Sequence, residues 1–179
     1  SSSNLIAVIK GNNINHPVSA TNTAILALLT STGTQMSTAN ILIENNLVTQ
    51  NSTSGVSRGI LVDTPDSGTS PLFTATIIGN NVNIMDNVAG VNGIAAQARQ
   101  SSAGCFDVRN NTVNYPNGVP GGVLGLRVRQ AGSATANLEQ GGSAGVATAV
   151  IAANNPASTT EILGTVNVVN NNFCLIAPN

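Results

Sequence analysis

Short apolar runs alternate along this chain with stretches rich in asparagine, serine, threonine and glycine. Runs such as residues 41–43 and 76–78 are rich in β-branched aliphatics and end within a few residues of an asparagine pair. This spacing is typical of short buried strands separated by turns. The second asparagines of five such pairs lie 33, 35, 30 and 60 residues apart. A repeat near 33 residues predicts a solenoid in which each repeat forms one coil.

A second row of apolar residues keeps nearly the same period. Its members Ile25, Ile60, Ile94 and Leu126 follow one another at intervals of 35, 34 and 32 residues. The alternation of a strand places this row, and the residue two positions after each member, toward the core. Two rows with one period predict at least two strands in each coil, and these strands would form separate parallel sheets.

The asparagine pairs predict a ladder of stacked side chains at one corner of the coils. Parallel strands lie about 4.8 Å apart, so equivalent amides on successive coils can hydrogen-bond to one another. Asparagine also tolerates the left-handed backbone that a sharp turn requires. Ordinary surface turns are the alternative, which the regular spacing disfavours. The predicted members of this structural ladder are Asn13, Asn46, Asn81, Asn111 and Asn171.

The outer face of the second row changes character along the chain. Its outward positions hold Leu26 and Leu28 in the first coil and Arg127 and Arg129 in the fourth. Leu26, Leu28 and Leu61 are therefore candidates for a contact patch. A loop or a short third strand could instead cover these leucines.

The 60-residue interval between Asn111 and Asn171 contains one departure from the repeat. Ser143 could cap a helix over residues 143–154, in which Val146, Ala149, Val150 and Ala153 recur at helical spacing. We therefore expect an all-β fold, a single right-handed parallel β-helix of about four to five coils with one short α-helix. The single domain would span residues 1–179, with a helical insertion at about 131–160. The first coil would present an open strand edge, to be covered either by further coils of a longer parent chain or by another molecule.

The composition agrees with a solenoid and argues against two kinds of partner. Hydrophobic residues make up 41% of the chain but aromatic residues only 2%, as expected when aliphatic side chains stack on their equivalents in the next coil. Six Lys and Arg residues and a net charge of −1 leave no electrostatic footprint for nucleic acid. The chain also lacks the apolar run of about 18 residues that a membrane span needs.

No catalytic or metal-binding constellation is evident, and no cofactor is expected. Glycoside hydrolysis needs two facing carboxylates, but the aligned repeats place no two acids in one row of neighbouring coils. Residues 55–59 match the G-x-S-x-G motif of a nucleophile elbow, but a strand follows the motif and the only histidine, His16, precedes it. The chain is therefore predicted not to be an enzyme. The seven acids are Glu44, Asp63, Asp66, Asp86, Asp107, Glu139 and Glu161.

The two cysteines, Cys105 and Cys174, are predicted to be unpaired. Alignment of Asn171 with Asn111 places Cys174 level with Asn114, whereas Cys105 lies nine positions earlier. A disulfide requires Cα atoms within about 7 Å, which this register does not allow unless the corner folds back tightly.

The strand–Asn-Asn units resemble a known kind of repeat. Together with residues 125–130, Leu138, Glu139 and the predicted helix before a final strand, they are similar to the C-terminal β-helical part of large, repetitive secreted bacterial surface proteins. The resemblance covers most of the chain and implies a pectate-lyase-like β-helix. It also implies an extracellular or cell-surface location and adhesin or extracellular-matrix roles, but it supplies no functional residues.

These observations favour a structural or adhesive segment of a secreted or cell-surface protein. Its partner would be itself, in end-to-end fibres or lateral oligomers, or surface glycans. The alternative is a carbohydrate-active β-helix enzyme or a glycan-binding module, because β-helices also host such sites.

Overall fold

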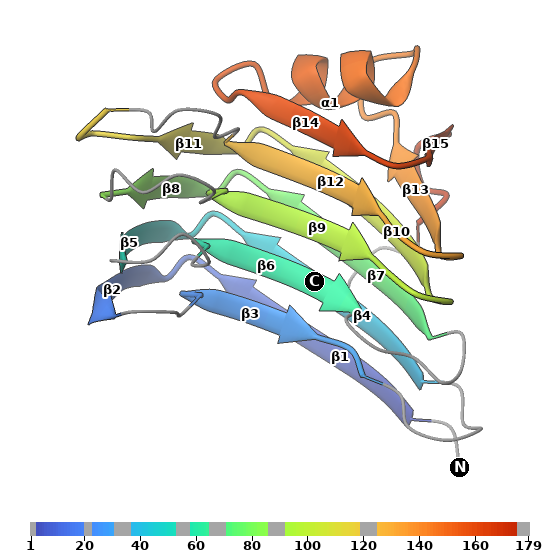
Figure 1. Cartoon of the computed structure of the whole chain (residues 1–179), viewed down its shortest axis with the longest axis horizontal. Coiled ribbons are helices and arrows are strands. Elements are labelled where there is room, and N and C mark those ends of the chain that lie inside the picture. Colours follow the sequence, from blue (N-terminus) through green and yellow to red (C-terminus); the bar gives the residue numbers. More distant parts are fainter. Residues whose placement is uncertain are drawn as a thin grey trace.

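The computed structural model shows parallel strands stacked in about four turns (Figure 1). It describes residues 3–19, 23–30, 37–52, 58–64, 71–85, 92–118 and 125–174. The chain is mostly strand with one short helix, and its sheets are all parallel. The predicted β-solenoid is confirmed, while its right hand stays a prediction.

The described strands form three sheets, one more than the minimum that the two sequence rows require. The first sheet contains β1 (Ser3–Lys10), β4 (Ser37–Glu44), β7 (Leu72–Ile78), β10 (Ala103–Arg109), β13 (Thr135–Glu139) and β15 (Val166–Val169). The second contains β2 (Asn13–Ser19), β5 (Leu47–Ser52), β8 (Asn81–Ile84) and β11 (Thr112–Asn114). The third contains β3 (Ile25–Leu28), β6 (Ile60–Thr64), β9 (Ile94–Ala98), β12 (Leu126–Gln130) and β14 (Thr160–Leu163).

The register of the third sheet reproduces the second sequence row. Ile25 pairs with Ile60, Ile60 with Ile94, and Ile94 with Leu126. All four side chains are buried, so the row faces the core as its alternation predicted. The row then ends at Thr160 of β14, where a hydroxyl replaces the aliphatic side chain.

The interior is a continuous stack of aliphatic side chains. Ile43 and Ile77 are paired neighbours in the first sheet, and both are fully buried together with Val82 of the second sheet. Each coil stacks such residues on their equivalents in the next coil, which explains how a chain with few aromatic residues fills its core.

Two glycines let the third sheet approach the second closely. Gly59 and Gly93 come directly before β6 and β9. A Cβ at either position would lie 2.3 Å from a methyl carbon, of Val82 in one case and of Val113 in the other. Any larger residue would therefore force the corner away from the core.

The helix is shorter than predicted and buries a different face. α1 spans Ala147–Asn154, and no side chain caps its N-terminus. Ser143 does not cap it, because Ser143 lies in the turn that follows β13 and its backbone N donates to the carbonyl of Gln140. The predicted face from Val146 to Ala153 is wrong except for Val150, because Val150, Ile151 and Asn154 are the buried residues. The interval 131–160 also contains β13, so the helical part of it is narrower than expected.

α1 closes the C-terminal end of the stack. It contacts β10, β14 and β15, and Figure 1 shows it lying over β14 at the end of the solenoid. Val150 and Ile151 are fully buried there and join the aliphatic core. Among the described helical residues, no helix is long and apolar enough to cross a membrane.

Candidate interaction surfaces

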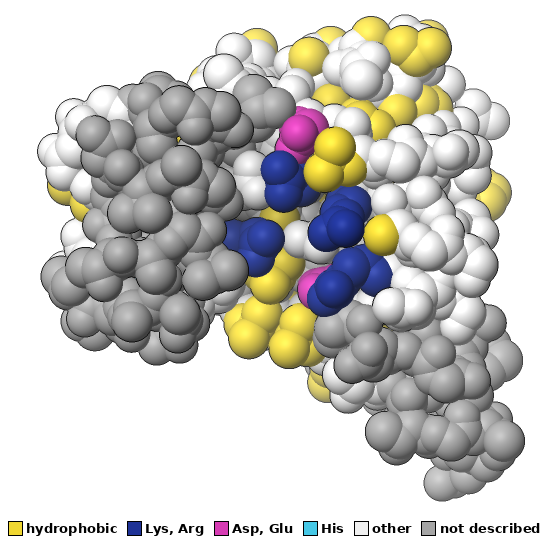
Figure 2. All heavy atoms as spheres, in the orientation of Figure 1, with side chains coloured by type: hydrophobic (Ala, Val, Ile, Leu, Met, Phe, Trp, Pro, Cys, Tyr) yellow, Lys and Arg dark blue, Asp and Glu magenta, His cyan; other side chains and the backbone are white. Residues whose placement is uncertain are grey.

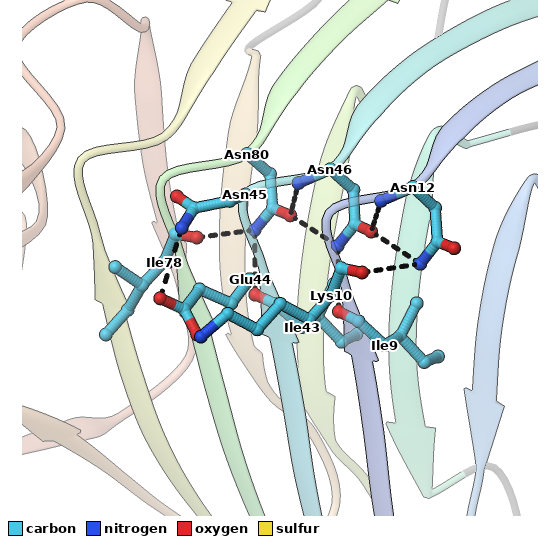
Figure 3. A network of polar contacts seen from close by, with 9 residues as sticks. All are labelled: Ile9, Lys10, Asn12, Ile43, Glu44, Asn45, Asn46, Ile78 and Asn80. Carbon is cyan, nitrogen blue, oxygen red and sulfur yellow. Dashed lines mark hydrogen bonds and ion pairs between the residues drawn. The ribbon is translucent and has the colours of Figure 1, made fainter. Parts of the chain in front are cut away.

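A ladder of asparagines, buried except at its first member Asn12, joins the coils at the corner between the first and second sheets (Figure 3). Asn46 donates from its backbone N and its Nδ2 to Oδ1 of Asn80, at 3.0 and 2.9 Å. Asn80 donates in the same way to Oδ1 of Asn111, at 3.0 Å in both cases. Nδ2 of Asn80 also donates to the carbonyl of Ile43 at 2.9 Å. The ladder consists of Asn12, Asn46, Asn80, Asn111 and Asn155.

The predicted ladder was therefore right in kind but wrong at three positions. Asn46 and Asn111 belong to it, whereas Asn13 and Asn81 are the first residues of β2 and β8. Asn171 lies outside the ladder and donates to the carbonyl of Gly141.

The error arises because asparagine and glycine share one position in the turn. The residue before each of the first four ladder asparagines has a positive φ, and this residue is Gly11, Asn45, Gly79 or Asn110. Asn45 and Asn110 therefore look like ladder members in the sequence but occupy the position that glycine fills elsewhere. The first asparagine in each run that follows a Gly or another Asn is the ladder member in these four cases.

The predicted contact patch is reduced to two leucines. Leu26 and Leu28 are about half exposed, at 51% and 46%, whereas Leu61 is only 9% exposed. Outward-facing Asp63 and Gln97, on the same part of the third sheet, are buried as well. Figure 2 shows Lys and Arg side chains over this part of the sheet, so the outer face becomes covered beyond the first coil.

The first coil exposes apolar side chains on more than one side. Leu5 faces the core, as does its partner Ala39, yet Leu5 is 50% exposed and Ala39 only 2%. The difference arises because β1, β2 and β3 are the end strands of their sheets, and no described strand pairs with their outer edges. We define the first-coil surface as Leu5, Ile6, Val8, Leu26 and Leu28.

Four arginines gather at the third sheet, in the central group of dark blue side chains in Figure 2. We define the arginine face as Arg58, Arg99, Arg127 and Arg129. Arg58 lies two residues before β6, Arg99 directly follows β9, and the other two are in β12. The alternation of β12 had placed Arg127 and Arg129 outward, but sequence reasoning missed Arg58 and Arg99 because they lie just outside strands.

Two carboxylates neutralise part of the arginine face. Arg99 donates hydrogen bonds to the carboxylate of Asp63, from Nε to Oδ1 at 2.8 Å and from Nη2 to Oδ2. Arg127 donates from Nε to Glu161 on the adjacent strand β14. Burial, followed by the charge of Arg127, lowers the pKa of Arg58 from its ordinary value, although Asp63 acts in the opposite direction.

Asp107 and Glu139 form a pair of buried acids on adjacent strands of the first sheet. Phe106 pairs with Leu138, so the next residue of each strand places these two acids in one row. The prediction that no two acids share a row on neighbouring coils is therefore wrong. It failed because the predicted ladder has no member between Asn111 and Asn171, so no asparagine fixed the row of Glu139.

Both acids are engaged by protein groups. Arg109 donates to both oxygens of Asp107, each at 2.6 Å, and this contact raises the pKa of Arg109. Glu139 accepts a hydrogen bond from the backbone N of Cys174 at 2.8 Å. Burial, with a smaller contribution from Asp107, raises the pKa of Glu139 above its ordinary value.

The prediction of two unpaired cysteines is also wrong, because Cys105 and Cys174 form a disulfide with their Cα atoms 5.4 Å apart. The register of the first sheet places Asn167, not Cys174, level with Cys105. The chain then turns back after β15, with Asn172 at a φ of 63°, and returns Cys174 to Cys105. A shallow depression of about 190 Å³ lies beside the disulfide, lined by Leu72, Thr74, Ala103, Gly104, Cys105, Asn137, Phe173 and Cys174.

The described residues contain no group of three or more His, Cys, Asp or Glu side chains that could hold a metal ion. Most of the G-x-S-x-G motif, at residues 55–57, lies outside the described part of the chain. The expectations of no cofactor and no catalytic activity stay predictions.

The geometry defines a class of protein, the parallel β-solenoids, here with about four turns and one helical end. No family model, curated protein or solved structure matches the chain. The assignment to this class therefore rests on strand pairing and register.

Proposed function

We propose that this solenoid is a structural segment of a secreted or cell-surface protein and associates through its first coil. The observation that carries the proposal is the contrast between the first-coil surface and the opposite end. Unpaired strand edges are templates for pairing with further strands, and a large exposed apolar patch marks an interaction surface. The first coil combines both features, whereas α1 covers the other end.

The occupant that we propose for the first-coil surface is a second copy of the chain, bound head to head. Head-to-tail stacking would require α1 to leave β14 and β15, exposing Val150 and Ile151. A two-fold contact avoids this cost because it uses the same surface on both copies. It would pair β1 with β1 in antiparallel orientation and cover Leu5 at the open end of the core. Closed pairs, rather than the fibres expected from the sequence, are thus the assembly that the fold supports best.

Two observations support an extracellular or surface location. The Cys105–Cys174 disulfide is of a kind that persists in oxidising compartments. The chain is also poor in charged residues, at 7%, and rich in asparagine and glycine. An adhesive role follows from the same proposal, since paired solenoids can present two identical outer faces. A carbohydrate-active enzyme has less support because Asp107 and Glu139 are both buried and engaged.

Sedimentation velocity over a range of concentrations tests the association. We expect a reversible dimer that Leu5→Lys dissociates, because the new charge would lie at the open end of the core and be buried between two copies. The matched control is Val146→Lys, an equally polar change at a side chain that is 70% exposed at the opposite end. It should leave the dimer intact. A monomer at every concentration would overturn the self-association, and filaments would overturn the restriction to closed pairs.

The location is tested separately on intact cells that express the full-length protein. Labelling by an antibody against this solenoid, without permeabilisation, is expected if the segment is displayed. Labelling only after permeabilisation would contradict it.

A further inference from the structure

The arginine face concentrates positive charge in a chain that has little of it. The chain has six Lys and Arg residues in all, and four of them make up this face. Among the described residues, Asp63 and Glu161 are the carboxylates that pair with it, which leaves two of the four positive charges unbalanced. Arg58 and Arg129 form none of the ion pairs seen in the described part of the chain.

One buried nitrogen atom of the Arg58 side chain lacks a hydrogen-bond partner within the described residues. This atom is Nε. A buried donor without an acceptor is costly, and polar groups of this kind normally have a partner. Burial and the charges of Arg127, Arg99 and Arg129 lower the pKa of Arg58, because each of them disfavours its cationic form. A bound anion would supply the missing acceptor and offset the repulsion between the arginines.

The neighbouring contacts indicate which anion fits. Arg99 engages both oxygens of the Asp63 carboxylate, so this surface already accommodates a planar carboxylate in the two-pronged geometry of a guanidinium. Nucleic acid fits less well, because the chain is only 2% aromatic and has no platform for stacking bases.

We propose that the arginine face is a binding site for carboxylate groups, in which Arg58 and Arg129 hold the ligand. Arg99 and Arg127 are already paired with Asp63 and Glu161, and they add positive potential at the edge of the site. The ligand carries at least two carboxylates, because two guanidinium groups are unbalanced. The site is independent of the first-coil association, so either proposal can fail without the other.

Isothermal titration calorimetry with citrate at low ionic strength tests the site. We expect saturable binding that weakens as salt is added, since exposed charges are screened. The variant Arg129→Gln should weaken citrate binding by about 10-fold, the loss expected for one charge-assisted hydrogen bond. Arg58→Gln should have at least as large an effect. If it fails to fold, Arg129→Gln carries the test, because the side chain of Arg129 makes no hydrogen bond or ion pair within the described residues.

The matched control is Lys10→Gln, which removes one positive charge from the first sheet and should leave citrate binding unchanged. Equal affinity for the wild type and Arg129→Gln, or no binding by the wild type, would overturn the proposal. A carboxylated oligosaccharide is the second probe and identifies the source of the carboxylates. Tighter binding than citrate at equal carboxylate concentration assigns the site to an acidic glycan, and weaker binding assigns it to a free organic acid.

Discussion

At the first coil, Leu5 faces the core and is half exposed, whereas Ile151 at the opposite end lies on the buried face of α1 and is fully buried. Both ends must terminate the same aliphatic stack. The helix does so by placing Val150 and Ile151 over the last coils, and Asn155 after it continues the ladder. The first coil has no equivalent element among the described residues. The comparison teaches that a solenoid is closed by covering both its core and its hydrogen-bonding corner, and only one end here has both.

The largest expected effect comes from the ladder. Asn80→Ala removes the acceptor of the buried backbone N of Asn46 and the side-chain donor to the carbonyl of Ile43. The backbone N of residue 80 still donates to Asn111. We expect it to lower the free energy of unfolding by ~4 kcal/mol, since each unsatisfied buried group costs about 1–3 kcal/mol. Asn12→Ala is the matched change at the exposed end and should cost only ~1 kcal/mol. Urea denaturation measures both, and equal losses would contradict the difference between interior and end.

The next effect compares the two ends directly. Ile151→Ala should lower the free energy of unfolding by ~3 kcal/mol, because it leaves a cavity between α1 and the core. Leu26→Ala in the first coil should change the free energy of unfolding by less than about 0.5 kcal/mol, because the side chain of Leu26 is already half exposed to solvent. Chemical denaturation of the protein at a concentration where it is monomeric measures both. A large loss for Leu26→Ala would show that the first coil is covered in the monomer.

The smallest effect depends on pH and concerns the acid beside the disulfide. The pKa of Glu139 is raised in the fold, so the native state binds more protons than the unfolded state just above the ordinary glutamate range. Its contribution to stability is therefore lost as pH rises through that window. Glu139→Gln keeps an acceptor for Cys174 but cannot ionise. We expect a small rise in Tm at neutral pH and none below the ordinary pKa of glutamate.

The matched control for the pH effect is an acid on β4, the strand that pairs with β1 of the first coil. Glu44→Gln removes a partly exposed acid that pairs with Lys10 of β1 at 2.9 Å. Exposed ion pairs contribute little, so no rise in Tm is expected at neutral pH. Thermal melts at several pH values measure both variants. A rise of equal size in Glu44→Gln would show that the gain reflects net charge rather than burial.

The sequence predicted the solenoid because its repeat is carried by side chains that stack on their equivalents. Strand alternation and the repeat period were enough to predict one core-facing row, and strand pairing confirms it. This row contains Ile25, Ile60, Ile94 and Leu126. The ladder register was harder to predict, because glycine and asparagine are interchangeable in the left-handed position before it.

The remaining features depend on where the chain leaves the repeat. The helical segment lengthens the interval between Asn111 and Asn155 to 44 residues, and Glu139 lies within this interval. The disulfide joins Cys105, which precedes the helix, to Cys174, which follows it. The alignment of Asn171 with Asn111 therefore placed Cys174 in the wrong row. Arg58 and Arg99 lie beyond strand ends, where alternation no longer tells which way a side chain points.

The ladder also determines where the chain can change in length. Successive ladder asparagines are 34, 34, 31 and 44 residues apart, yet each donates to the next through the same two nitrogen atoms. Ten extra residues, including a whole helix, are thus tolerated provided that the amide returns to its place in the column. The corner acts as a fixed reference point, and the remainder of each coil is free to gain or lose sequence. A designer, or natural selection, could therefore insert new loops into this scaffold while leaving its other coils undisturbed.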